Sequence, residues 1–301
     1  MFRGPPPCPE FLPSPQPGAV LRPTSHGRCH WVWRDEVVGD AVRDWGSFGP
    51  VAEVTAALRR LGPTAQLVDV GTNVGLVSAA ALASGHDVTC FEAEAHNVAL
   101  WRATLALNNW TTRATVVDRA VVANSTEERS VGFRRWDVRN RGGSRIVRGT
   151  KKDARTPTTH LDLWASRLPR GAPVVMKLDI EGCEHGALRG ARRHMLPRVR
   201  ALFTEISPRA MAACGGNASQ YVNLLRRQGF EVRRRGGERA LHAEILDAQA
   251  HGRILDAAFW RPADTMAGKF GQMLVGSLTK IYADSLLCVS SAASRASHTR
   301  S

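Results

Sequence analysis

"LVDVGTNVGLVS", residues 67–78, is an apolar run that ends in two glycines on either side of an asparagine. The apolar run has the length of a buried strand, and the alanine-rich residues that follow it, up to residue 85, have the composition of a helix. A glycine-containing turn between a strand and a helix brings free backbone N–H groups to the carboxyl end of a sheet. The stretch therefore predicts an α/β fold with a ligand at this turn.

The alternation of strand and helix continues on both sides of this stretch. The expected elements are helices at 49–62 and 96–110, and strands at 86–94, 114–122, 172–182, 199–207 and 284–291. Strands that alternate with helices are typical of a doubly wound, mostly parallel sheet with helices on both faces. This is the architecture that we expect for the chain.

Composition divides the chain into one domain and two flanking segments. The proline-dense residues 1–28 predict a disordered leader, residues 29–290 a single domain, and residues 291–301 a disordered tail. Within the domain, the arginine- and glycine-rich residues 129–157 predict a basic insertion or loop. The net charge of +14 is compatible with nucleic acid, anionic substrates or an acidic membrane surface, but arginines among glycines without an aromatic platform are more typical of a solvated loop.

The cysteines give no sign of a metal site. The six cysteines are scattered, with no CxxC pair and no spacing typical of zinc, so no metal ion is predicted. Cys90 and Cys183 lie in apolar or turn segments, where small buried thiols are expected. No run approaches the roughly 20 apolar residues that cross a bilayer, and the N-terminus lacks the apolar core of a secretory signal. These observations predict a cytoplasmic protein in a reducing compartment, without a transmembrane segment.

The glycine turn differs from the dinucleotide-binding pattern GxGxxG. Asn73 occupies the place of the second glycine, which lets the backbone approach a pyrophosphate, and Leu76 occupies the place of the third. A ligand without phosphates is therefore favoured. Glu92 follows the next strand, about twenty residues further on, where a carboxylate accepts hydrogen bonds from ribose hydroxyls.

Two further carboxylates complete the predicted cofactor site. Asp69, at the end of the first strand, is expected to meet a ligand ammonium group through water, and Asp118, after the third strand, to reach an adenine amino group. An adenosine ligand with an ammonium group and no pyrophosphate is S-adenosylmethionine. A single glycine turn followed by an acidic residue also occurs by chance in α/β proteins.

A second group of polar residues follows the strand at 172–182. Asp179, Glu181 and Glu184 lie within six residues of one another, after Lys177. If this strand neighbours the first, its end faces the glycine turn, and Asp179 or Glu181 is the candidate general base. A structural interpretation exists as well, because Glu184 can stabilise the first turn of a helix and Lys177 can simply pair with an acid.

Taken in order, "LVDVGTNVG", "VTCFEAEAHN", "HLDLW" and "VMKLDIEGCE" resemble the FkbM-type methyltransferases, from about residue 37 to residue 207. The resemblance implies a class I, S-adenosylmethionine-dependent enzyme with a Rossmann-like, seven-stranded sheet that methylates hydroxyl groups, often on sugars or natural products. It implies cofactor binding by Gly71, Thr72, Asn73, Gly75 and Glu92, and places Asp179 and Glu181 near the methyl group and its acceptor. The chain lacks the prolines that are common after the phenylalanine–glutamate pair, and it has His185 where an apolar residue is more usual, so the acceptor is the least defined property.

Three other functions stay open. An RNA or other nucleic-acid methyltransferase would use the same core and the basic segment to contact phosphates. A nicotinamide-dependent oxidoreductase shares the fold class, but the chain lacks the second glycine of its turn. A non-catalytic module would bind S-adenosylmethionine without turnover. We expect a small-molecule or glycan hydroxyl as the acceptor, and the sequence does not define the oligomeric state.

Overall fold

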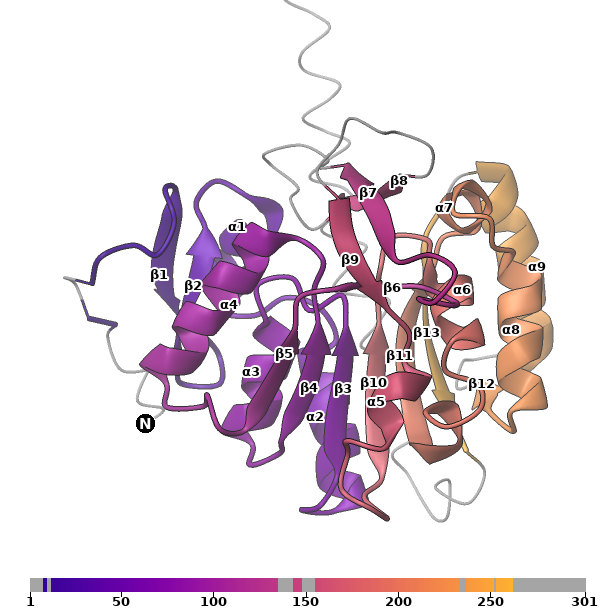
Figure 1. The fold of residues 1–301 in the computed structure, drawn as a ribbon, viewed down its shortest axis with the longest axis horizontal. Helices are drawn as coiled ribbons and strands as arrows, with labels where there is room; N and C mark the ends of the chain where they lie inside the picture. Colours follow the sequence, from indigo (N-terminus) through magenta and orange to yellow (C-terminus); the bar gives the residue numbers. More distant parts are fainter. Residues whose placement is uncertain are drawn as a thin grey trace, which may run out of the picture.

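The computed structural model of this protein describes residues 8–9, 12–134, 143–147, 155–232, 237–251 and 253–261. Within these residues the main sheet has seven strands in the order β12-β13-β11-β10-β3-β4-β5 (Figure 1). Their bounds are β3 (Gln66–Val70), β4 (Val88–Phe91), β5 (Ala114–Val117), β10 (Val174–Leu178), β11 (Val199–Ile206), β12 (Glu231–Val232) and β13 (Leu255–Trp260). All neighbours from β5 to β11 are parallel, whereas β13 is antiparallel to β11 and β12. The prediction of an α/β fold is confirmed, with a mixed sheet in which parallel pairs predominate.

The main sheet is covered on both faces because its strands carry apolar side chains in both directions. In β3, Val68 and Val70 belong to the hydrophobic core on one face, and Leu67 belongs to the core on the other. The face of Leu67 is covered by α2 (Val51–Leu61), α3 (Leu76–Ala83) and α4 (Ala95–Leu107). The opposite face is covered by α5 (Asp162–Ala165), α6 (Glu184–Arg189), α7 (Pro208–Ala213), α8 (Ala218–Arg227) and α9 (Gly237–His251).

An N-terminal hairpin precedes this sheet and packs beside α4 (Figure 1). It consists of β1 (Ala19–Pro23) and β2 (Cys29–Trp33), and it is followed by α1 (Val37–Trp45). The prediction of a disordered leader over 1–28 is therefore wrong for residues 19–28, because the apolar residues of β1 pair with β2 and share its core. Residues 1–7 and 10–11 lie outside the described part of the chain.

A small sheet lies above the carboxyl edge of the main sheet (Figure 1). Its described strands are β6 (Ala120–Val121), β7 (Ser130–Arg134), β8 (Arg145–Val147) and β9 (Arg155–Thr159), in the order β6-β9-β7-β8. β7 and β8 fall within the predicted basic insertion, 129–157, and β9 begins within it. The described part of that segment is thus a sheet and not a plain loop, since Val131 is buried and β7 pairs with both β8 and β9. The remainder of the segment, 135–142 and 148–154, lies outside the described residues.

Two disulfides correct the interpretation of the cysteines. Cys8 is bonded to Cys29, and Cys183 to Cys214, whereas Cys90 is a buried free thiol. The expected thiol is therefore confirmed for Cys90 and wrong for Cys183. The partners are 21 and 31 residues apart, so only the fold brings them together. The prediction of a reducing, cytoplasmic compartment loses its support from the cysteines, because disulfides persist mainly in oxidising compartments.

The C-terminal part of the sheet differs from the sequence prediction. The strand that pairs with β11 is β13, whereas the strand expected at 284–291 and the tail at 291–301 lie outside the described residues. In the part of the chain that the structure describes, no helix has the length and apolar character needed to span a bilayer.

Candidate active site

A cavity of about 230 Å³ opens at the carboxyl edge of the main sheet, where β3 and β10 are neighbours. The register of these strands pairs Asp69 with Lys177. The glycine turn after β3 and the acidic loop after β10 therefore leave the sheet side by side. The cavity is also lined by the end of β4, by β8 of the small sheet, and by residues of α1 and of the loop before α2.

The glycine turn is in direct contact with the loop after β10. Gly71 has a φ of 83°, and a Cβ at this position would lie 1.7 Å from the carbonyl oxygen of Asp179. Only glycine allows this approach. Asn73 has a φ of 54°, a left-handed conformation that is uncommon for residues other than glycine. Backbone strain of this kind is concentrated at functional sites.

Glu92 lies just after β4 and holds the glycine turn from inside the cavity. Its carboxylate accepts the backbone N–H groups of Asn73 at 2.7 Å, Ala93 at 3.1 Å and Glu94 at 2.8 Å. Burial raises the pKa of Glu92 to about 7, although the N–H groups of Glu94 and Asn73 favour the charged form. Since carboxylate oxygens have about four acceptor positions, the group can fix the turn and still accept a ligand hydroxyl.

Lys177 joins the two loops through its ammonium group. Its Nζ donates to the carbonyl oxygen of Gly71 at 2.8 Å, and it lies 3.3 Å from Asp179 Oδ2 and 3.6 Å from Asp69 Oδ1. Burial disfavours the charged form, but Asp179 and Asp69 outweigh this effect and raise the pKa of Lys177. Lys177 is thus a charged, buried link between the turn and Asp179.

The acidic loop presents Glu181 to the cavity. Glu181 has a φ of 57°. After Asn73, it is the second non-glycine residue at the site with a left-handed backbone conformation. Burial, followed by the charges of Asp179 and Glu184, raises the pKa of Glu181 to about 8. Glu184 stabilises the acidic loop itself, because its Oε1 accepts hydrogen bonds from the N–H groups of Ile180 at 2.9 Å and Gly182 at 3.1 Å.

The structure brings together most of the predicted site residues, but not all. Of the predicted site residues, those that line the cavity are Gly71, Thr72, Asn73, Glu92, Asp179 and Glu181. Asp69 is fully buried behind the turn, where Ser78 Oγ donates to it at 2.6 Å. Gly75 is the N-cap of α3, packed against Trp101.

Asp118 does not reach the cavity. Its side chain is 60% exposed and lies 3.4 Å from Arg102. The loop after β5 places this carboxylate at the surface of the molecule, so an adenine contact of Asp118 does not follow from the fold.

Glu205 is a cavity residue that the sequence analysis did not single out. It lies on β11, directly after the residue that pairs with the end of β10. Its own partner on the neighbouring strand β13 is Asp256. Asp179, burial and Asp256 together raise the pKa of Glu205 to about 9. An acidic residue at the end of a predicted strand, in "FTEIS", is the signal that would have found it. Arg145 of β8 also lines the cavity, and no sequence signal indicated that the small sheet folds over it.

The arrangement suits a ligand that combines an apolar ring with hydroxyl groups. Val74, Leu76 and Phe91 supply apolar wall, and Glu92 lies beside them as a hydrogen-bond acceptor. Across the cavity, Glu181 and Asp179 supply carboxyl groups that can accept a proton from a second molecule. This donor set fits an adenosine ligand at the glycine turn and a hydroxyl compound at the acidic loop. Among the described residues, no cluster of side chains with the arrangement of a metal site is present.

The comparisons with known proteins show the family of the chain. A family model described as the methyltransferase FkbM domain matches residues 69–232, more than half of the chain. No curated protein matches the chain.

Several solved structures are similar at low identity. A SAM-dependent methyltransferase from Agrobacterium tumefaciens is 12% identical, with 84% of this chain and 72% of that chain covered and a TM-score of 0.42. An rRNA methylase from Streptococcus thermophilus is 12% identical, covering 71% and 97% of the two chains, with a TM-score of 0.39. A SAM-dependent O-methyltransferase from Thermotoga maritima is 13% identical, covering 72% and 65%, with a TM-score of 0.35. These likenesses are too distant to indicate a substrate for this chain.

Proposed function

This chain belongs to the FkbM methyltransferase domain family, and we propose that it transfers the methyl group of S-adenosylmethionine to a hydroxyl oxygen of a sugar or small natural product. One observation carries the proposal: the glycine turn, Glu92 and the carboxyl groups of Asp179 and Glu181 line a single cavity. The turn and the acidic loop come from distant parts of the sequence. The turn would bind the methyl donor, and the acidic loop would receive the acceptor.

The cofactor half of the site is formed by residues 71–73 and Glu92. Glu92 would accept a ribose hydroxyl, and the backbone of the turn would lie against the rest of the ligand. When bound, S-adenosylmethionine would supply a methyl group on a positively charged sulfur, which an acceptor oxygen could displace to leave S-adenosylhomocysteine. The chain contributes by aligning the acceptor and excluding water, and alignment alone can supply ~7–11 kcal/mol.

The acceptor half removes a proton from the hydroxyl group. An alcohol is a poor nucleophile, so a base within hydrogen-bond distance accelerates the reaction. Glu181 takes the proton, because its raised pKa of about 8 makes its carboxylate a stronger base than an ordinary one. Asp179, held by Lys177 at 3.3 Å, orients the hydroxyl group. The proton then passes from Glu181 to solvent.

Two measurements test the proposal. Isothermal titration calorimetry with S-adenosylhomocysteine is expected to show micromolar binding, and absence of binding at millimolar ligand contradicts the proposal. Methyl-labelled S-adenosylmethionine is then offered with neutral sugars, polyhydroxylated natural products or RNA, and the product is identified by mass spectrometry. Transfer to a hydroxyl compound that persists in a chelator is expected. Transfer to RNA alone would favour the nucleic-acid alternative, and binding without any transfer would favour a non-catalytic module.

A further inference from the structure

His30 is a buried histidine that the proposed chemistry does not use. It lies on β2, is 0% exposed, and its Nε2 is 2.7 Å from the carbonyl oxygen of Val74. A carbonyl oxygen can only accept, so Nε2 carries the proton and donates. Burial lowers the pKa of His30 to about 3, opposed by the bond to Val74, so the ring stays neutral. His30 is therefore a neutral hydrogen-bond donor directed at the turn.

The acceptor of this bond belongs to the wall of the cavity. Val74 lines the cavity directly after the left-handed Asn73. Lys177 and Glu92 hold the first part of the same turn, and both lie within residues 69–232, which the family model matches. His30 holds the second part and lies outside the matched residues. The turn thus has a hydrogen-bond partner that precedes the residues matched by the family model.

The imidazole ring also packs beneath the turn. It is stacked on Trp101 of α4, with ring centroids 5.8 Å apart and an interplanar angle of 19°. The same indole lies against Gly75, where an added Cβ would be 2.2 Å from the ring. His30 therefore contacts the Val74 carbonyl and Trp101 contacts the next residue, Gly75, and a displaced imidazole would lose both the hydrogen bond to Val74 and the stacking on Trp101.

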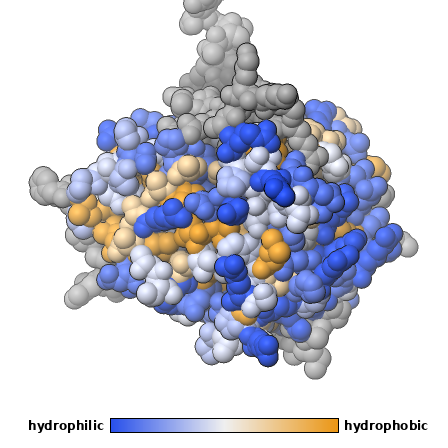
Figure 2. All heavy atoms as spheres, viewed as in Figure 1, coloured by the Kyte–Doolittle hydropathy of each residue, from blue (hydrophilic) through white to orange (hydrophobic). Residues whose placement is uncertain are grey.

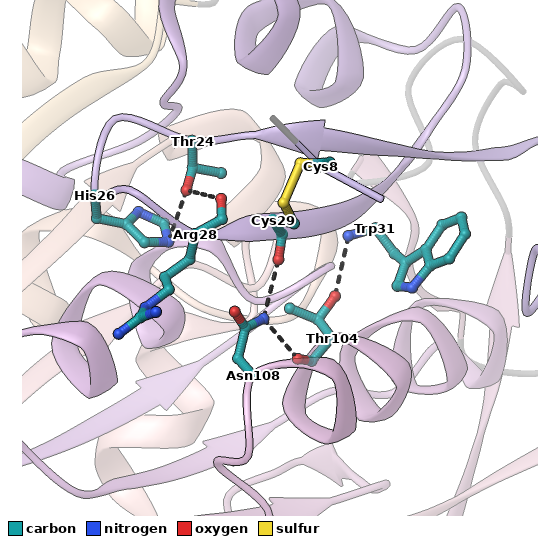
Figure 3. Close-up of a disulfide and its surroundings, with 8 residues drawn as sticks. All are labelled: Cys8, Thr24, His26, Arg28, Cys29, Trp31, Thr104 and Asn108. Carbon is teal, nitrogen blue, oxygen red and sulfur yellow. Dashed lines mark hydrogen bonds between the residues drawn. A yellow bond between two sulfur atoms is a disulfide. The ribbon is translucent and has the colours of Figure 1, made fainter. Parts of the chain in front are cut away.

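The backbone that carries His30 is fixed on both sides (Figure 3). The N–H of Trp31 donates to Thr104 Oγ1 at 3.1 Å, and Asn108 Nδ2 donates to the carbonyl oxygen of Cys29 at 3.0 Å. Cys29 also carries one of the two disulfides. The hairpin is thus attached to α4 immediately before and after His30, which gives the imidazole a defined position relative to the turn.

We propose that His30 is a positioning residue of the cofactor site, which fixes the Val74 carbonyl and so the conformation in which the turn receives the cofactor. This inference rests on the proposed function, since it assigns His30 to the binding of S-adenosylmethionine. It extends the cofactor site to the N-terminal hairpin.

The test compares variants at His30 in the full, oxidised chain. His30→Leu removes the donor, whereas His30→Gln keeps an amide N–H at the position of Nε2. The dissociation constant of S-adenosylhomocysteine is measured by calorimetry, and the urea midpoint of each variant is measured in parallel. His30→Leu is expected to weaken binding about tenfold, the order that follows from one lost buried hydrogen bond, and His30→Gln is expected to restore most of the affinity.

His86 provides the matched control. It is 4% exposed, and its Nδ1 lies 3.1 Å from the carbonyl oxygen of Ala65, so it is also a buried histidine bonded to a backbone carbonyl. Ala65 and His86 precede β3 and β4, at the edge of the sheet opposite the cavity. His86→Leu is expected to lower the urea midpoint as His30→Leu does, and to leave the affinity for S-adenosylhomocysteine unchanged.

The outcomes separate the two levels of inference. Three results would overturn the role of His30 alone. His30→Leu could bind S-adenosylhomocysteine as tightly as the unaltered protein, His86→Leu could weaken binding as much as His30→Leu does, or His30→Gln could fail to recover the affinity. Failure of the unaltered protein to bind S-adenosylhomocysteine would overturn the proposed function and this inference with it. If His30→Leu does not fold, His30→Asn replaces it, because its shorter amide does not reach the Val74 carbonyl, and the same results are expected.

Discussion

Glu181 shows how burial at the scale of a single residue changes the chemistry of a carboxyl group. Its pKa of about 8 means that the carboxylate becomes available only as the pH rises toward that value. We expect kcat/KM to increase with pH up to about 8 and Glu181→Gln to lower kcat by about 10²–10⁴-fold. The dissociation constant of S-adenosylhomocysteine is expected to change by less than about twofold. Full activity of the variant across this pH range would assign the base to another group.

Glu92 and Asp118 provide a direct comparison between two carboxylates that the sequence placed at the cofactor. Glu92 holds the Asn73 N–H at 2.7 Å inside the cavity, whereas Asp118 is 60% exposed beside Arg102. Glu92→Ala is expected to weaken binding of S-adenosylhomocysteine by about 10–100-fold, because hydrogen bonds to charged groups contribute about 1.5–3 kcal/mol. Asp118→Ala is expected to leave the calorimetric affinity unchanged. A similar loss in both variants would mean that Asp118 reaches the ligand after all.

The raised pKa values also predict how stability depends on pH. Glu181 and Glu205 keep their protons in the folded protein up to about pH 8 and about pH 9, whereas the unfolded chain loses them near pH 4.5. The unfolded chain then binds fewer protons, so this stabilisation is complete below about pH 4.5 and is lost as the pH rises through the folded values. The slope is about 1 kcal/mol per pH unit for each group. Urea unfolding at several pH values is expected to show a shallower decline for Glu205→Gln than for the unaltered protein.

The exposed Glu127 is a suitable control for this measurement. Glu127→Gln is expected to reproduce the pH dependence of the unaltered protein, because Glu127 is exposed and lies outside the cavity. Parallel curves for Glu205→Gln and the unaltered protein would contradict the prediction.

At this scale, the position of a residue could be predicted from the sequence where a motif determines both the residue and its neighbours. Asn73 and Glu92 follow from the turn and the next strand, and the structure places both at the cavity. The position of Asp118 could not be predicted, because the spacing of residues in the sequence does not encode the direction in which a loop leaves its strand. Glu205 was missed because its role depends on the pairing of β11 with β10 and β13, which is a property of the sheet and not of the motif.

At the scale of elements, the Cys183–Cys214 disulfide joins the start of α6 to the end of α7, beside the acidic loop. Its partners are 31 residues apart, and closing a loop of this size contributes about 3–4 kcal/mol through the entropy of the unfolded chain. Replacing both cysteines by serine is expected to lower the free energy of unfolding by about this amount, measured by urea denaturation without reductant.

The free thiol and the second disulfide give the controls. Cys90→Ala leaves both disulfides intact, so reductant is expected to destabilise this variant as much as the unaltered protein. In the double serine variant, reductant is expected to act through Cys8–Cys29 alone and to have a smaller effect. If reductant destabilises the double variant as much as the unaltered protein, the Cys183–Cys214 disulfide does not contribute.

Elements with a strong local pattern could be predicted, and those defined by distant partners could not. The run from β3 to β5 follows the expected strands and helices because hydrophobic periodicity and glycine stops act within a few residues. The hairpin residues 19–28 could not be distinguished from a leader, because prolines dominate the preceding composition. The pairing of β7 with β9 and the two disulfides depend on contacts across the fold.

The charge of the whole molecule bears on the nucleic-acid alternative. The net charge is +14, and Figure 2 shows hydrophilic residues gathered over the part of the face that contains α8 and α9. We expect single-stranded RNA to bind at about 50 mM salt and to dissociate by about 200 mM, because such contacts release counterions. Fluorescence anisotropy measures this binding.

The cavity, in contrast, is lined by several acidic side chains. Glu92, Asp179, Glu181 and Glu205 all line it, so the bound RNA is expected to gain no label from methyl-labelled S-adenosylmethionine. Labelled RNA, or binding that survives at the higher salt, would contradict the prediction and favour the alternative.

The antiparallel strand β13 has a consequence for the chain during its synthesis. The family match ends at residue 232, yet β11 pairs with β13 over residues 255–260. Until those residues leave the ribosome, β11 presents an open row of backbone groups next to the most buried part of the sheet. Open edges of this kind recruit other strands and promote aggregation. The sheet is therefore completed by a strand that is translated after the matched residues, and the edge of β11 stays open during that interval.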